Sequence, residues 1–213
     1  MELSPIQYFT ISIIPVLLAI TVHEAAHGYA AKHFGDKTAY FLGRITLNPI
    51  KHIDPIGTVV IPGMLLLLSA PFLFGWAKPV PVNFSNLNNP KKDMMWVALA
   101  GPASNLVMAI IWAIILGLFK SSGASYALFV IGMAQVGIMI NLVLMLLNLL
   151  PIPPLDGGRM AVSLLPSPWS YKLASIERYG MFILIFLIVS GLLSAILLPL
   201  LRFFQGTLIG IFV

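Results

Sequence analysis

The sequence of 213 residues contains no cysteine, which excludes disulfide bonds and any zinc site built on thiolates. Charged residues are also scarce, at 9% of the chain, whereas 59% of residues are hydrophobic and the mean hydropathy is +0.98. Soluble domains carry about a quarter charged residues, so an ordinary soluble domain is excluded. The composition therefore predicts a protein that lies in a lipid bilayer. Because the sequence has no cysteine, any metal ligands must be histidine or carboxylate side chains.

Basic residues outnumber acidic ones, twelve to seven, which gives a formal net charge of +5. They are spread along the chain and form no patch, so a nucleic-acid partner is not expected. Between membrane spans, such residues set topology and meet anionic lipid head groups. The first four residues lack the basic region of a signal peptide, so we expect the first apolar helix to remain in the mature protein.

Apolar stretches occur at about residues 8–31, 57–75, 94–119, 127–149 and 179–201. All but the second predict membrane-spanning helices. The second contains Pro62, Gly63 and Pro71, which interrupt a regular helix. No connection is long enough for a separate soluble domain. The sequence therefore predicts an all-α polytopic membrane protein with one domain over residues 1–213, expected in the cell membrane.

The run His23-Glu24-Ala25-Ala26-His27 lies inside the first apolar stretch. Residues four apart share one face of a helix, so His23 and His27 can direct imidazoles at one zinc ion. Glu24 flanks that face, and its carboxylate can take a proton from water that the metal makes acidic. A pair of packing histidines is the plainer interpretation, but ionisable side chains are costly at membrane depth unless they face a cavity or an ion.

A catalytic zinc ion also needs a third protein ligand and one open position. A glutamate about twenty residues further along is excluded, because the next glutamate after Glu24 is Glu177. A few other side chains are candidates for the third ligand, in predicted loops or at a helix break: His33, His52, Asp54 and Asp156.

These candidates are not equally favoured. His33 has the spacing of a known third ligand, but Ala30 stands where that pattern has the glycine that turns the chain. Asp54 precedes a proline and is typical of a turn. Asp156 follows three prolines at the end of a span, and broken backbone at membrane depth must be buried in protein or line a cavity.

Three motifs taken together resemble the site-2 protease family of intramembrane metalloproteases. They are His23–His27 in one membrane helix, Ala100–Asn105 at the start of a second, and Asn148–Gly158 at the end of a third. The resemblance covers about residues 8–159. It implies a catalytic core of three helices, at about residues 8–165. The apolar stretch at about 179–201 predicts a C-terminal membrane helix after this core.

The resemblance also implies roles for single residues. His23, His27 and Asp156 would bind one zinc ion, Glu24 would activate water, and Asn148 would hold the substrate or the developing oxyanion. Asn105 is expected to be structural. No PDZ domain fits between the metal motif and Asp156, and no CBS domain follows the last predicted span, as in a minimal branch of the family.

Membrane topology restricts residues 57–75. His23 lies roughly 22 Å along a helix that starts near Tyr8, towards the C-terminal end of that helix. Asp156 must return to that side of the bilayer, which the spans at 94–119 and 127–149 already achieve. We therefore predict that residues 57–75 make no single net crossing and form a hairpin or re-entrant segment bent at Pro62-Gly63 or Pro71.

The predicted function is a zinc-dependent endopeptidase that cleaves a membrane-protein substrate in or near its transmembrane segment. The residues Trp76–Phe84 are extended and rich in proline, and could present a partial strand edge to an unwound substrate. The alternative is a metal transporter or channel that binds a passing ion. Transport has no evident need for a base beside a metal ligand, so Glu24 distinguishes the two.

Overall fold

The computed structural model describes residues 4–68, 75–122 and 126–213, which form helices and connecting loops without a β-strand. Four described helices are long and apolar enough to cross a membrane. They are α1 (Pro5–His33), α4 (Pro90–Lys120), α5 (Ala127–Asn148) and α9 (Leu192–Phe212). The predicted all-α membrane fold is confirmed, and the spans expected at 8–31, 94–119 and 127–149 correspond to α1, α4 and α5.

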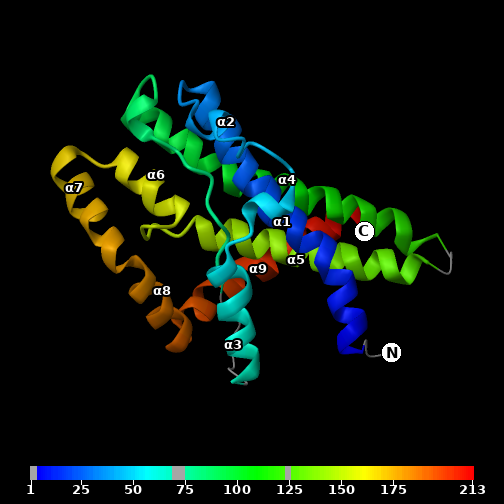
Figure 1. The fold of residues 1–213 in the computed structure, drawn as a ribbon. Coiled ribbons are helices and arrows are strands. Elements are labelled where there is room, and N and C mark those ends of the chain that lie inside the picture. Colours follow the sequence, from blue (N-terminus) through cyan, green and yellow to red (C-terminus); the bar gives the residue numbers. More distant parts are fainter. Residues whose placement is uncertain (1–3, 69–74, 123–125) are drawn as a thin grey trace.

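The helices α1, α4 and α5 lie side by side and form the centre of the molecule (Figure 1). Ser4 begins α1 with a capping box, because its hydroxyl accepts from the Gln7 backbone N–H while the Gln7 side chain accepts from the Ser4 N–H. His27 contacts Val97, and His23 contacts Asn105, so α1 and α4 run in opposite directions. Residues near the end of α1 therefore face residues near the start of α4.

Away from these contacts, the helices pack through apolar side chains. The cluster joins α4, α5 and α9, and its buried members include Trp112, Leu116, Ile138, Leu142 and Leu201. In lipid, helices associate through close van der Waals packing, because the tails are as apolar as the side chains. This cluster packs α5 against α4 and α9.

The segment after α1 leaves the bundle and returns to it. It contains α2 (Thr38–Phe41), the 3₁₀ turn η1 (Pro49–His52), the π-helical turn η2 (Pro55–Val60) and α3 (Ile61–Leu67). In Figure 1, α3 projects away from α1 and α5. An extended stretch and the short turn η3 (Phe84–Asn86) then lead into α4.

The two ends of this projection are hydrogen bonded to each other. The Trp76 N–H donates to the Gly57 carbonyl at 3.1 Å, and the Lys78 N–H donates to the His52 carbonyl at 2.9 Å. The chain thus comes back to the place it left, as a hairpin or re-entrant segment requires. Of the two bends predicted, Pro62-Gly63 is wrong because both residues lie inside α3, and Pro71 lies outside the described residues. No helical span of membrane length occurs between α1 and α4 among the residues described.

The C-terminal helix predicted at 179–201 is wrong in its bounds. The structure has a 3₁₀ turn η4 (Ile176–Tyr179), then α8 (Gly180–Val189), then α9 from Leu192 to Phe212. Gly191 separates α8 from α9 with a φ of 75°, a left-handed conformation that glycine adopts without strain. Hydropathy averaged over a long window does not detect a single turn residue. The sequence therefore did not predict the break at Gly191 or the continuation of α9 past Arg202.

Two short helices, α6 (Asp156–Leu164) and α7 (Ser167–Ser175), follow α5. The hydroxyl of Ser163 donates to the Lys91 carbonyl, and the Lys91 ammonium donates to the Leu165 carbonyl at 2.6 Å. The end of α6 is thus fixed to the first turn of α4. Its first residue, Asp156, is directed back towards α1.

Candidate metal centre

Side chains from two distant parts of the chain meet at the buried face of α1. The Nε2 atoms of His23 and His27 lie 3.1 Å apart. The Asp156 Oδ2 atom lies 3.3 Å from the first Nε2 and 3.2 Å from the second. All three residues are buried, with 6–9% of their surface exposed. We call this part of the bundle the metal end, and the part where α4 ends and α5 begins the far end.

The other ring nitrogens fix which atoms can bind a metal. The Nδ1 of His27 lies 2.7 Å from the Val97 carbonyl, which can only accept, so this Nδ1 carries the proton. The Nδ1 of His23 lies 2.6 Å from the Asn105 Oδ1 and donates to it in the same way. In neutral imidazoles the two Nε2 atoms therefore present lone pairs, the state that binds metal.

The residues present fit a zinc ion. Two imidazole lone pairs and a carboxylate oxygen repel one another at this distance unless a cation or a proton lies between them. The Asp156 Oδ2 is buried and receives no hydrogen bond among the described residues. Tetrahedral bonds of about 2.0–2.1 Å separate ligand atoms by about 3.3 Å, close to the 3.1–3.3 Å found here.

Gly101 allows α4 to approach this group. A Cβ atom at this position would lie 2.4 Å from the His27 Nε2 and 2.6 Å from the His23 Cε1. Any side chain would therefore displace the imidazoles. This contact gives a physical reason for the glycine in the motif Ala100–Asn105.

The other candidates for third ligand lie outside the group. Among the described residues, the histidines and carboxylates close enough to share one ion are His23, His27 and Asp156. His52 is buried elsewhere, with its Nε2 donating to the Thr46 carbonyl. Asp54 accepts from the first backbone N–H groups of η2, as its turn pattern predicted. His33 packs against the Phe34 ring.

Glu24 is held by the backbone of the extended stretch before α4. The Val80 N–H donates to the Glu24 Oε2 at 2.7 Å. Val80 is itself fixed, because the Arg44 guanidinium donates to the carbonyls of Lys78 and Pro79 at 3.1 and 3.3 Å. The carboxylate predicted to act as base therefore has a defined orientation beside the metal ligands.

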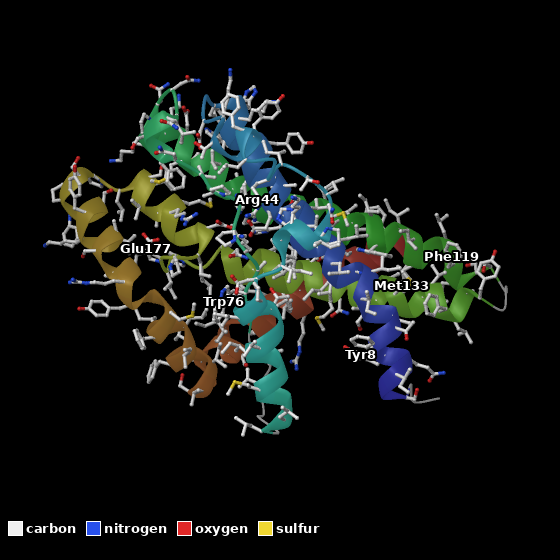
Figure 2. All side chains as sticks on the ribbon, viewed as in Figure 1. Tyr8, Arg44, Trp76, Phe119, Met133 and Glu177 are labelled. Atoms are coloured by element: carbon white, nitrogen blue, oxygen red, sulfur yellow. The ribbon has the colours of Figure 1, made fainter. Side chains whose placement is uncertain are left out.

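A cleft with a volume of about 510 Å³ opens next to these residues. His23 and Glu24 line it from α1, and Asn148 lines it from α5. The remaining lining is mainly apolar and comes from α5, α8 and the ends of the projection, including Leu144, Leu147, Trp76, Met181 and Leu184. In Figure 2, Trp76 lies where α3 meets the body of the molecule, far from Phe119 at the far end of α4.

Asn148 lines the same cleft as His23 and Glu24. Its Nδ2 donates to the Leu144 carbonyl at 3.0 Å, one turn earlier in α5. An amide nitrogen carries two hydrogens, so this bond leaves one N–H for a ligand in the cleft. Its role in holding substrate or oxyanion stays a prediction.

Sequence reasoning missed two partners of the site. The Val80 N–H is a backbone group, and no sequence pattern indicates where it points. Asn141 is different, because it is a fully buried amide in the apolar helix α5 and bonds to Asn105 at 2.9 Å. A polar residue within a membrane helix is itself a signal of function or of a specific contact.

Comparison with known proteins supports this chemistry. Residues 115–191 match the model of peptidase family M50. Two relatives bear the name "Putative zinc metalloprotease": YwhC of Bacillus subtilis, 40% identical over 96% of this chain and 94% of its own length, and Rip2 of Mycolicibacterium smegmatis, 30% identical over 89% and 72%. No solved structure gives a significant match. The chain belongs to peptidase family M50, the site-2 protease family of zinc metalloproteases.

Proposed function

We propose that this metalloprotease is an intramembrane endopeptidase that hydrolyses a peptide bond in or near the transmembrane segment of a membrane-protein substrate. One observation carries the proposal. His23 and Glu24 line a mainly apolar cleft whose walls include α1 and α5, which are both candidate membrane spans. A site built into spanning helices is reached most directly by a substrate that lies in the same bilayer.

His23, His27 and Asp156 would hold one zinc ion through two Nε2 atoms and a carboxylate oxygen. Bound zinc supplies positive charge that acidifies water and polarises a peptide carbonyl. The Glu24 carboxylate takes a proton from the attacking water and returns it to the departing amine. The Val80 N–H keeps one Glu24 oxygen in place, and the second N–H of Asn148 would stabilise the carbonyl oxygen as charge develops on it.

A helical substrate must unwind locally, because its carbonyls are already hydrogen bonded. The extended stretch Trp76–Phe84 is the candidate strand edge, but some of its backbone N–H groups already form hydrogen bonds within the protein. The N–H groups of Lys78 and Val80 already donate to the protein. Val82→Pro therefore tests the strand edge without disturbing Glu24, whereas Val80→Pro would also remove the donor to the base.

The distribution of charge supports an orientation. Ten of the twelve basic residues lie in segments that the described spans leave on the metal-end side, because α4 and α5 together return the chain to that end: Lys32, Lys37, Arg44, Lys51, Lys78, Lys91, Lys92, Arg159, Lys172 and Arg178. Lys120 lies at the far end. Basic loops stay in the cytoplasm, so we propose that the metal end faces the cytoplasm of a cell membrane.

The absence of native cysteine makes this orientation simple to test. Single cysteines at Lys51, Lys78 and Lys92 should react with an impermeant thiol reagent only after the membrane is opened. Ser121→Cys should react from outside intact cells. Labelling of Lys51→Cys and Lys78→Cys from opposite sides would contradict the proposed return of residues 57–75.

The function itself is tested by comparing wild type with Glu24→Gln in liposomes that contain candidate membrane proteins. Loss of a general base costs about 10²–10⁴-fold in rate, so cleavage should nearly disappear while bound zinc stays at the wild-type level. Cleavage that is unchanged by the substitution would rule out the protease mechanism. Zinc flux across the membrane, unaffected by Glu24→Gln, is the result that the transporter alternative predicts.

A further inference from the structure

A line of hydrogen bonds runs from the metal ligand His23 across α4 into α5. The His23 Nδ1 meets the Asn105 Oδ1 at 2.6 Å, and the Asn105 Nδ2 donates to the Asn141 Oδ1 at 2.9 Å. The Asn141 Nδ2 donates in turn to the Gly137 carbonyl at 2.8 Å. Asn105 and Asn141 each have 0% of their surface exposed.

Each amide has only one orientation that satisfies its neighbours. The Gly137 carbonyl can only accept, so Asn141 must turn its nitrogen towards it and its oxygen towards Asn105. Asn105 must then turn its nitrogen towards Asn141 and the Ala19 carbonyl, which lies 3.2 Å away. Its oxygen is left for the His23 Nδ1. The Gly137 carbonyl thus fixes the orientation of both amides, and through them the atom that faces the His23 imidazole.

The consequence concerns the tautomer of His23. Because Asn105 offers only an acceptor, the imidazole must carry its proton on Nδ1 and direct the Nε2 lone pair at Asp156 and His27. A metal-binding histidine is commonly oriented in this way by a carboxylate or a carbonyl. The Val97 carbonyl orients His27 in this way. His23 is oriented by the side chain of Asn105, which a substitution can change.

We infer that Asn105 and Asn141 are positioning residues for zinc, which set the tautomer and ring orientation of His23 and thereby raise zinc affinity. The inference rests on the proposed metal site. The alternative is that the two amides merely hold α1, α4 and α5 together, since such bonds do stabilise membrane helices. The two readings differ in what they predict for Asn105→Asp.

Asn105→Asp keeps an acceptor for the His23 Nδ1 but loses the N–H groups that bond to Asn141 and Ala19. If Asn105 only joins helices, Asn105→Asp should be as harmful as Asn105→Leu, because both remove those bonds. If Asn105 positions His23, Asn105→Asp should keep zinc affinity near the wild-type value. Asn105→Leu should weaken zinc binding by about 10–100-fold, the usual effect of losing such a partner.

The experiment measures the zinc dissociation constant of each purified variant in detergent by competition with a chelator. Ser104→Ala is the matched control, since the Ser104 hydroxyl donates to the Gly101 carbonyl and touches neither imidazole. It should bind zinc as wild type does. Folding of every variant is checked by circular dichroism. Because the readout is zinc affinity, the result does not depend on whether the protein cleaves membrane proteins.

Asn141→Leu keeps the inference testable if Asn105→Leu fails to fold. It removes the oxygen that orients Asn105, so it should weaken zinc binding in the wild-type background, by less than Asn105→Leu. In the Asn105→Asp background, no N–H faces Asn141, and the same change should leave zinc affinity unaltered. Equal losses in both backgrounds, or zinc affinity as poor in Asn105→Asp as in Asn105→Leu, would overturn the inference.

Discussion

The helices α1, α4 and α5 meet through buried polar groups at the metal end, whereas α4 and α5 meet through apolar side chains at the far end. His23, Asn105 and Asn141 are joined by hydrogen bonds of defined direction. Trp112, Leu116 and Ile138 belong to the buried apolar cluster. A substitution at the metal end should therefore affect zinc binding and cleavage more than thermal stability. A substitution at the far end should affect thermal stability more than zinc binding.

Removal of a metal ligand should give the largest difference between the two ends. Asp156→Ala takes away the only carboxylate of the group, so zinc affinity should fall by more than the roughly 100-fold expected for an outer partner. Cleavage should be lost with it. Zinc content and dissociation constant are measured on the purified protein, and full zinc occupancy in Asp156→Ala would refute the proposed ligand set.

Gly101→Ala tests the close approach of α4 to the imidazoles. The added methyl would lie 2.4 Å from the His27 Nε2, so the ligands must shift, at a cost of about 1–3 kcal/mol for overpacking. Zinc affinity should fall together with thermal stability. Gly206→Ala on α9 is the matched control, because its Cβ would meet no atom within 4 Å. Wild-type zinc binding in Gly101→Ala would count against this geometry.

Leu116→Ala examines the far end. Leu116 is buried in the apolar cluster, and its truncation should destabilise the fold by about 2 kcal/mol, at the low end for such a change. The zinc affinity of the folded protein should not change. Thermal unfolding in detergent, with zinc titration alongside, separates the two effects, and weakened zinc binding here would show that the ends are coupled.

Asp36→Asn should have the smallest effect, confined to the metal end and dependent on pH. Burial raises the pKa of Asp36, but hydrogen bonds from Thr38, Asn83 and Asn86 outweigh it and hold the pKa below its usual range. A lowered pKa means that ionised Asp36 contributes stability above its unfolded pKa of about 3.9, which is lost as pH falls through the lower folded value.

The stability difference between wild type and Asp36→Asn should thus be full at neutral pH and shrink below about pH 4. Thermal melts over a pH series measure it. The difference between wild type and Leu116→Ala should stay constant over the same series, since no titratable group is altered. A difference for Asp36→Asn that grows on acidification would contradict the assigned sign.

Much of the site was predictable because it is local. His23, Glu24 and His27 share one helix, and helical periodicity alone places the two imidazoles on one face. Asp156 required the family resemblance, since spacing left His33, His52 and Asp54 open. The three central spans were predictable because a bilayer demands long apolar helices. The break at Gly191 was not, because one turn residue barely changes the hydropathy of a long window.

The sequence by itself determined that the surroundings are a lipid bilayer, which helices span it, and two of the three members of the metal group, because composition and helical periodicity act over short range. Only the tertiary structure decided which carboxylate completes the group, that the Val80 N–H holds Glu24, and that Asn105 and Asn141 form a directed line to His23. The physical reason is that hydrogen bonds between distant segments depend on packing, and packing leaves no period in the sequence.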